Sequence, residues 1–258
     1  MALAAVRTLG RHEAPRRLSL PEVHEMMLRT LIVPVALLVS APVLAQDAAK
    51  GGQVDVPDFH GVAVSHGIHA EVKPGPKSVR LEGDKDDLAR VRLEVKDGVL
   101  TTQVQKSPKL FSWGGTSNVR LYVTSPRVES VAASGGAHVE AEATRSDTFE
   151  VAASGGSELN IRGVDSKKLE VAASGGSELK LKGRTGELEI EGSGGSVIEA
   201  RKVQAESLEV TASGGTRVEA SPERRISGAL SGGSTVKAST RPQSVQVNSS
   251  GGSEVQYE

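Results

Sequence analysis

Three histidines near the start of the chain have the residue type and the closeness that a metal site needs. His60, His66 and His69 lie within ten residues of one another. A metal site requires three or four converging ligands with supporting contacts behind them. Gly67 places a turn between His66 and His69, so the two do not form a ligand pair on one helical face. We therefore expect solvent-exposed histidines at strand ends, with no metal site and no cofactor.

Carboxylates form two groups that could support acid–base chemistry. The first group consists of Asp84, Asp86 and Asp87. The second recurs once in each repeat of the later chain and consists of Glu150, Glu170, Glu189 and Glu209. Enzymes that cleave polysaccharides need a carboxylate pair, or basic residues beside a metal, on one face. We interpret the aspartates as a charged turn and the glutamates as a solvent-facing ladder, relieved by Lys168, Lys180 or Lys182, and expect no catalytic residues.

A serine precedes two glycines seven times, and such a column resembles a row of nucleophiles. The serines are Ser134, Ser154, Ser174, Ser193, Ser213, Ser231 and Ser250. Hydroxyls at a tight bend commonly hydrogen-bond the backbone and stack on one another, and we expect that role here. The steps from each serine to the next are 20, 20, 19, 20, 18 and 19 along the chain. A period of about 20 residues is typical of a solenoid, in which each repeat is one coil.

Side chains around each Ser-Gly-Gly alternate between apolar and polar, as in strands with one buried face. The residues three positions after the second glycine are Val139, Leu159, Leu179, Ile198, Val218, Val236 and Val255. The residue after each of these is polar in every repeat. Each coil is therefore predicted to contain a strand, a Gly-Gly corner with positive φ, a second strand, and a variable polar turn such as residues 163–168 or 221–225.

We predict an all-β fold, a right-handed single-stranded parallel β-helix of about 20 residues per coil. The regular coils are expected from about residue 128. Equivalent strands would stack about 4.8 Å apart, and parallel connections are overwhelmingly right-handed. A calcium-binding β-roll does not fit, because it needs a nine-residue repeat with aspartate ligands and no aspartate column follows the glycine pairs.

The segment before the repeats is also strand-rich but lacks the period. Expected strands are residues 62–64, 68–72, 78–82, 91–95, 100–104 and 119–123, with a short helical turn at 86–90. An aromatic cluster of Phe111, Trp113 and Tyr122 occurs near a loop at 106–118. We expect Phe111 and Trp113 to cover the open end of the β-helix, since exposed strand edges need a cap. Contact with a partner is the alternative role for these two side chains.

The opening of this segment resembles a bacterial family. Residues 58–64 (DFHGVAV), 68–72 (IHAEV) and 91–100 (VRLEVKDGVL) are similar to the start of the putative auto-transporter adhesin, head GIN domain family. Members continue with a strand like 119–123 and a train of Val-x-x-Ser-Gly coils. The resemblance covers about residues 54–258 and implies a right-handed single-stranded β-helix in the bacterial envelope, with no established activity or catalytic residues. The chain departs from the family pattern in its doubled glycines, where Ser-Gly followed by a small residue would suffice.

The N-terminal region has the features of an export signal. Arg29 precedes an apolar run at residues 31–39, and Val43-Leu44-Ala45 has the small residues of a cleavage site. We predict cleavage between Ala45 and Gln46, with a retained N-terminal anchor as the alternative. The apolar run is short for a membrane span. No cysteine follows it, which excludes a lipid anchor on cysteine.

These features divide the chain into a signal peptide (1–45), a flexible lead-in (46–53) and a single β-helix domain (54–258). Residues 1–25 do not fit the short basic start of a signal, and we interpret them as an extension upstream of an initiator Met26 or Met27.

Composition narrows the functional classes. The chain has no cysteine, so disulfides and cysteine-based metal or redox sites are excluded. A formal net charge of −1 and the lack of a long basic run argue against a nucleic-acid partner. We predict an exported, non-enzymatic adhesin-like or structural module of the periplasm or cell surface, with no membrane span in the mature chain. Its expected partners are an envelope glycan or protein, or further copies through the last coil at 245–258; the alternative is a carbohydrate-active β-helix enzyme.

Overall fold

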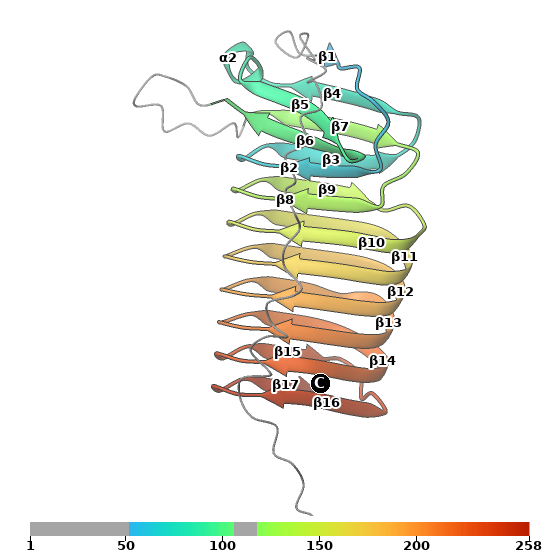
Figure 1. Cartoon of the computed structure of the whole chain (residues 1–258), viewed down its shortest axis with the longest axis vertical. Helices are drawn as coiled ribbons and strands as arrows, with labels where there is room; N and C mark the ends of the chain where they lie inside the picture. The colour runs from blue at the N-terminus through green and yellow to red at the C-terminus, as the bar shows by residue number, and fades with distance from the viewer. Residues whose placement is uncertain (1–51, 106–117, 258) are drawn as a thin grey trace, which may run out of the picture. The chain divides into compact units, whose positions relative to one another are not determined.

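The computed structural model describes residues 52–105 and 118–257. These residues are mostly β-strand, and the strands stack in parallel along one axis, so the predicted β-solenoid is confirmed (Figure 1). Among the described residues, none of the helices has the length and hydropathy of a membrane span.

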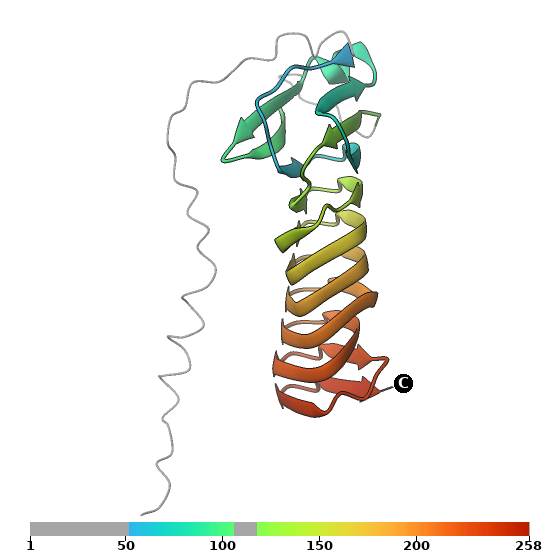
Figure 2. The same ribbon diagram turned by 90° about the vertical axis from the view of Figure 1, so that its right-hand side faces the viewer.

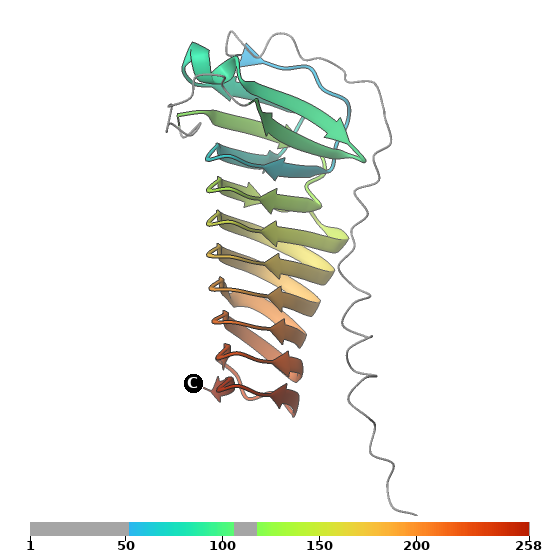
Figure 3. The same ribbon diagram turned by 60° about the vertical axis from the view of Figure 1, so that its left-hand side comes forward.

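The regular coils are built from strands that flank the Ser-Gly-Gly motifs. They are β8 (Ser130–Ala133), β9 (His138–Glu142), β10 (Ser146–Ala153), β11 (Glu158–Ala173), β12 (Glu178–Gly192), β13 (Val197–Ala212) and β14 (Arg217–Leu230). Neighbouring coils pair in parallel with equivalent residues in register, as for Leu169, Leu188 and Leu208. The glycine pairs consequently lie above one another, as predicted (Figure 3).

Each coil has two arms around a thin apolar core. We call the arm that leaves a glycine pair the outgoing arm and the arm that returns to the next pair the returning arm. In β11, Leu159 and Ile161 of the outgoing arm are fully buried, as is Leu169 of the returning arm. Side chains at alternate positions face solvent, which produces the predicted period of two.

The two edges of the solenoid differ. At the edge formed by the glycine pairs, the Gly-Gly edge, the chain makes a tight turn between strands. At the opposite edge, the predicted polar turns at 163–168 and 221–225 are not separate turns, because β11 and β14 continue through them as strand. Backbone pairing between coils is retained around this bend, with shifts of register at a few positions.

The stack extends further towards the N-terminus than the predicted start near residue 128. Strands β2 (Gly61–Val64) and β3 (His69–Pro74) pair in parallel with β8 and β9 and form one more coil. Its corner is Ser65-His66-Gly67, which lies where the next coil has Ser134-Gly135-Gly136. His66 adopts φ +62° in place of the first glycine, a conformation that histidine tolerates better than most residues.

The chain between these two coils forms the cap. It comprises β4 (Ser78–Glu82), α2 (Lys85–Leu88), β5 (Val91–Lys96), β6 (Val99–Val104) and β7 (Arg120–Ser125). Strands β6 and β7 stack in parallel on β2 and β3. Strands β5 and β4 then pair antiparallel to β6 and β7, which ends the parallel stack (Figure 2). The predicted aromatic cap of Phe111 and Trp113 lies outside the described residues, as does the predicted cleavage site at Ala45 and Gln46.

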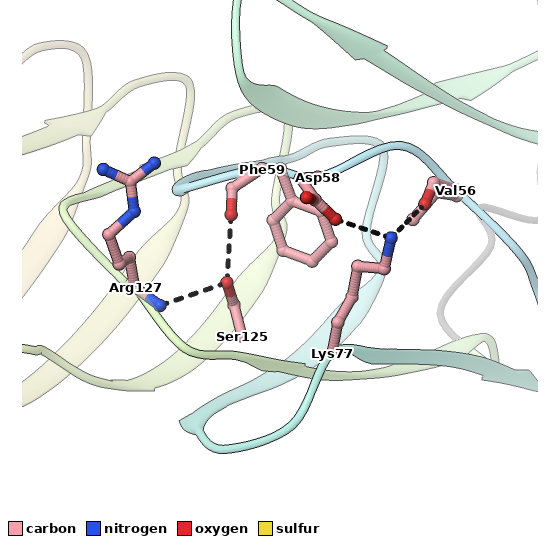
Figure 4. Close-up of polar contacts among 6 residues, drawn as sticks. All are labelled: Val56, Asp58, Phe59, Lys77, Ser125 and Arg127. Atoms are coloured by element: carbon pink, nitrogen blue, oxygen red, sulfur yellow. Dashed lines mark hydrogen bonds and ion pairs between the residues drawn. The ribbon is translucent and has the colours of Figure 1, made fainter.

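A strap at residues 54–60 holds this cap against the first coils. Lys77 Nζ donates hydrogen bonds to the Val56 carbonyl (2.9 Å) and to Asp58 Oδ1 (2.7 Å), and Ser125 Oγ donates to the Phe59 carbonyl (3.0 Å), as Figure 4 shows. The Lys77 ammonium lowers the pKa of Asp58. Just before the strap, β1 (Gly52–Gln53) pairs with β4, so the end of the predicted flexible lead-in is a strand.

The last described coil is less covered than the others. It consists of β16 (Ser244–Ser249) and β17 (Glu254–Tyr257), which pair with β14 and with β15 (Thr235–Ala238). Val245 and Tyr257 are 41% and 43% exposed, although the equivalent residues of inner coils are buried.

Candidate functional site

The outgoing arms carry a polar surface that includes two adjoining hollows among the described residues. A cavity of about 310 Å³ opens on this face where β7, β3 and β9 lie side by side. We call it the histidine cavity, and its lining residues are His69, Ala70, Glu71, Arg120, Leu121, Tyr122, His138 and Glu140. It spans three stacked strands, so residues far apart in sequence meet there.

Strand register arranges the polar lining residues in two columns. Arg120, His69 and His138 are successive neighbours in the first column. The second column contains Tyr122, Glu71 and Glu140, two positions further along the same three strands. Because side chains two positions apart point to the same face of a sheet, both columns project outward together.

Several of these side chains already have partners. The His69 and His138 rings are 5.5 Å apart at their centroids and tilted by 32°. His138 Nδ1 lies 3.1 Å from Glu158 Oε2, and Glu71 forms an ion pair with Lys73.

The remaining groups leave bonding capacity in the cavity. The Arg80 guanidinium lies 4.6 Å from the centroid of the Tyr122 ring, over one of its faces. Within the described ranges, Arg120 and Glu140 make no ion pair and no side-chain hydrogen bond. The cavity therefore offers the unpaired guanidinium of Arg120 and the unpaired carboxylate of Glu140 to a ligand, together with the rings of His69 and His138.

A smaller hollow of about 70 Å³ adjoins the histidine cavity, because the two share Glu71 and Glu140. It is also lined by Lys73 of β3 and by Arg162 and Lys182 of the following coils. Arg162 Nε lies 3.3 Å from Glu142 Oε2, whereas Lys182 has no ion pair within the described residues. Polar recognition groups thus extend from the cap along the outgoing arms.

The predicted glutamate ladder lies on the other face of the solenoid. Glu150, Glu170, Glu189 and Glu209 are successive register neighbours on the returning arms. Lys168 Nζ bridges Glu170 (2.7 Å) and Glu189 (2.6 Å), and both carboxylates raise the pKa of Lys168.

The predicted relief of this ladder by other lysines is only partly right. Lys180 belongs to the outgoing arm, where it pairs with Glu178 (2.6 Å) and Glu158 (3.7 Å). Of the three lysines, Lys168 is therefore the one that forms ion pairs with the ladder. The ladder is a solvent-facing surface.

The three candidate histidines of the sequence do not converge. His69 lies in the histidine cavity, His60 places its ring against Gly98, and Ser65 Oγ lies 2.7 Å from His66 Nδ1 at the Gly-Gly edge. In the part of the chain that the structure describes, no three histidine, aspartate or glutamate side chains are grouped to hold a metal. The aspartates at 84–87 lie at the start of α2, as the predicted charged turn.

Sequence reasoning missed His138, although a signal for it exists. Aligning Ser65-His66-Gly67 with Ser134-Gly135-Gly136 brings His69 opposite His138. Tyr122 was singled out as part of an aromatic cluster and Arg120 was not. Neither had a signal that placed it in this cavity, because β7 contains no repeat motif and its stacking on β3 follows from the cap.

The serine column plays a different part from the one predicted. The buried hydroxyls belong to the residue after each glycine pair, in the column Ser157, Ser177, Ser196, Thr216 and Ser234. Thr216 Oγ1, for example, donates to the Ser213 carbonyl at 2.8 Å, and Ser234 Oγ donates to the Ser231 carbonyl at 2.7 Å. The bend is hydrogen-bonded as predicted, but by the following hydroxyl.

The chain matches a family model and several solved structures. Residues 58–242 match the model described as putative auto-transporter adhesin, head GIN domain. No curated protein matches the chain. A putative adhesin from Bacteroides fragilis NCTC 9343 is 18% identical with a TM-score of 0.73, covering 81% of this chain and 96% of that one.

Two further structures come from Parabacteroides. A putative lipid binding protein from Parabacteroides distasonis ATCC 8503 is 13% identical with a TM-score of 0.58, covering 81% of this chain and 96% of that one. A putative adhesin from Parabacteroides merdae ATCC 43184 is 16% identical with a TM-score of 0.53, covering 81% and 95%. At these identities the likeness concerns the fold. The family model covers most of the chain, and the chain belongs to the family described as putative auto-transporter adhesin, head GIN domain.

Proposed function

We propose that this chain is an exported, non-enzymatic module that binds an envelope glycan or protein through the outgoing-arm face. The observation that carries the proposal is the histidine cavity, where Arg120 and Glu140 have no partner among the described residues. Polar groups that converge in a hollow and lack internal partners are typical of a binding site. Membership of an adhesin-like family supports the same function.

The surface around the cavity favours an extended ligand. Side chains of successive coils repeat along the outgoing arms at about the 4.8 Å spacing of paired strands. The adjoining hollow at Lys73 and Lys182 extends the polar surface beyond the histidine cavity. A polymer or a partner protein could therefore contact several coils at once.

A carbohydrate-active enzyme is the second candidate, and one observation favours it. Glu71 and Glu140 are register neighbours that both line the cavity, and glycoside hydrolysis uses two carboxylates that flank the scissile bond. The Glu71–Lys73 ion pair occupies one of the two, which leaves Glu140 as the carboxylate free to act.

One experiment separates the two candidates. Purified residues 46–258 are titrated with envelope polysaccharide and envelope protein fractions, and the polysaccharide is analysed for new reducing ends or unsaturated products. Saturable binding without products supports the binding module. Turnover that is lost in Glu140→Gln while binding persists supports the enzyme. Failure to bind any fraction would contradict the proposed function.

Location is part of the proposal. We place the mature chain in the periplasm or on the cell surface, on the basis of the signal-like residues 29–45. Fractionation combined with protease treatment of intact cells separates the two compartments, and a cytoplasmic protein with residues 1–45 uncleaved would contradict export. Self-association through β16 and β17 stays a prediction.

A further inference from the structure

We propose that the histidine cavity recognises an acidic sugar, a uronate unit of a glycan, by pairing its carboxylate with Arg120 and its hydroxyl groups with Glu140. This inference rests on the proposed binding function and names the ligand class for the same site. Three features of the cavity support this inference: the charges of the side chains in its two columns, the hydrogen-bonding groups in each column that have no partner, and its volume.

The first column supplies the partner for a carboxylate. Arg120 projects from β7, between His69 of β3 and Glu82 of β4, and makes no ion pair within the described residues. A guanidinium binds a carboxylate through two parallel hydrogen bonds, which gives both strength and orientation. His69 follows on the neighbouring strand, about 4.8 Å away, and can donate a further hydrogen bond from its ring. Arg80 lies over the Tyr122 ring and forms an ion pair with Glu82, so the carboxylate opposite Arg120 on β4 already has a partner.

The second column supplies acceptors for hydroxyl groups. Glu140 is exposed and unpaired in the described chain, and Glu71 lies beside it in register. Ionised carboxylates only accept hydrogen bonds, so they need donors from the ligand. A sugar ring has several hydroxyl donors and, in a uronate, a single carboxylate. The arrangement of Arg120 in one column and Glu140 in the other matches that combination.

The same two glutamates disfavour an acidic peptide. A peptide rich in aspartate and glutamate would bring several carboxylates towards Arg120 and would place some of them beside Glu71 and Glu140. Like charges at such distances repel, and the ligand would offer these glutamates few donors. The cavity is therefore better suited to one negative charge surrounded by hydroxyl groups than to many negative charges.

Size and openness fit a unit within a chain. A volume of about 310 Å³ is at the lower end of the range of roughly 300–1,000 Å³ for ligand sites, which leaves room for one or two sugar rings. The adjoining hollow leads to Lys182, which has no ion pair among the described residues and would offer positive charge to a second carboxylate along the polymer. A glycan with uronates at intervals could thus run along the outgoing arms.

Isothermal titration of residues 46–258 with four disaccharide probes tests the inference. The probes are the α-1,4-linked galacturonate disaccharide, its methyl ester and the corresponding neutral galactose disaccharide, and the glucuronate disaccharide serves as a second acid. We expect at least one of the two acids to bind, at least ten-fold more tightly than the ester and the neutral sugar. Arg120→Gln should weaken binding of the acid at least ten-fold and leave the weak binding of the neutral sugar unchanged.

Arg217→Gln is the matched control, because Arg217 is an exposed arginine of the same column on a distant coil. It should bind the acid like the unmodified chain. Thermal unfolding checks that the variants fold, and His69→Gln serves as a second cavity variant if Arg120→Gln unfolds, with an expected smaller loss of affinity for the acid.

Three results would overturn the inference: no binding of either acid, equal affinity for acid and ester, or unchanged acid binding in the cavity variants. Tighter binding of a poly-glutamate peptide than of both acids would overturn it in favour of a protein ligand. If the inference fails while the chain still binds neutral envelope polysaccharide or an envelope protein, the proposed function stands. If no envelope fraction binds either, the proposed function fails as well.

Discussion

The Gly-Gly edge and the opposite edge of the solenoid join the same two arms in different ways. At the Gly-Gly edge, every first glycine has positive φ, from 58° at Gly135 to 72° at Gly214, and every turn has the same number of residues between its two strands. At the opposite edge, the residues between Ile161 and Val164, or between Ala200 and Gln204, differ in number from coil to coil. One edge has a fixed length, and the other accommodates variation in length.

The register explains the uneven repeat lengths. Between β11 and β12, two residues of β11 face a single residue of β12 at the opposite edge, and the coil of β12 is accordingly shorter by one. Between β13 and β14, Arg201, Lys202 and Val203 have no counterparts, whereas β14 has one extra residue near Glu223. The coil of β14 is accordingly shorter than that of β13 by two. The period is therefore set at the glycines, and changes in coil length are accommodated at the opposite edge.

Single-residue insertions should reveal the largest difference between the edges. One glycine inserted between Gly214 and Gly215 would disrupt the Gly215 N–H to Gly194 carbonyl hydrogen bond (2.7 Å) or slip Val218 out of the core. We expect a loss of about 3–5 kcal/mol in unfolding free energy. One glycine inserted between Glu223 and Arg224 should lower it by about 1 kcal/mol or less.

Urea denaturation followed by circular dichroism measures both insertions against the unmodified chain. Because a solenoid unfolds coil by coil, the comparison uses the transition midpoint as well as the extrapolated free energy. Equal destabilisation by the two insertions would contradict the distinction between a fixed edge and an adaptable one.

Two adjacent glycines should respond differently to the same small substitution. Gly214 has φ +72°, and a Cβ there would lie 2.8 Å from the Gly194 carbonyl oxygen. We expect Gly214→Ala to lower the unfolding free energy by about 2–4 kcal/mol. At Gly215 the nearest atom to a Cβ is 3.7 Å away, an ordinary contact, and φ is not positive.

Gly215→Ala is therefore the matched control, with an expected change within about 0.5 kcal/mol. Thermal and urea midpoints of the pair give the measurement. The prediction is wrong if Gly215→Ala is as harmful as Gly214→Ala. A small effect of Gly215→Ala would show that the second position of the corner accepts a small residue other than glycine.

The contrast between the edges also shows what could be predicted from the sequence. Ser-Gly-Gly spacing and the aliphatic column that starts at Val139 predicted the coils, because each repeats a local requirement of backbone or burial. The coil of β2 and β3 was not recognised, because His66 replaces the first glycine of its corner. The antiparallel pairing of β4 and β5 was not predictable either, since it depends on contacts between distant segments without any periodic signal.

The residues of the candidate site also differ in how far the repeat predicts them. His69 was singled out from the sequence, and His138 could be found by extending the repeat by one coil. Arg120 and Tyr122 join them only through the stacking of β7 on β3, which is a property of the cap. Functional residues in this fold are thus hardest to predict where the repeat ends.

The buried hydroxyls at the Gly-Gly edge should have an intermediate effect. Thr216 is 1% exposed, and its Oγ1 donates to the Ser213 carbonyl at 2.8 Å. Thr216→Val keeps the shape but removes this hydrogen bond, and we expect a loss of about 1–2 kcal/mol. Thr211→Val, at an exposed position on the returning arm, should change the free energy by no more than about 0.5 kcal/mol. Similar effects of the two substitutions on the urea midpoint would show that the hydroxyl column adds nothing to the fixed edge.

The smallest effect is expected from an ion pair at the opposite edge. Arg184 donates from Nε to Asp165 Oδ1 (3.0 Å) and from Nη2 to Oδ2 (2.8 Å), which links two coils, and it lowers the pKa of Asp165. A carboxyl with a lowered folded-state pKa contributes stability above its ordinary pKa, and this is lost as pH falls through the folded-state value. Arg184→Gln should therefore lower the thermal midpoint slightly at neutral pH and low salt. The difference from the unmodified chain should shrink in about 1 M salt and vanish in strong acid.

Lys202→Gln is the control for Arg184→Gln, because it removes a positive charge at the same edge from a side chain without an ion pair among the described residues. Its midpoint should match that of the unmodified chain at every pH and salt concentration. An Arg184→Gln effect that survives high salt, or that approaches the effect of Gly214→Ala, would mean that the opposite edge is held as rigidly as the glycines. The freedom to vary coil length there argues otherwise, since surface ion pairs of this kind can be remade after a change of register.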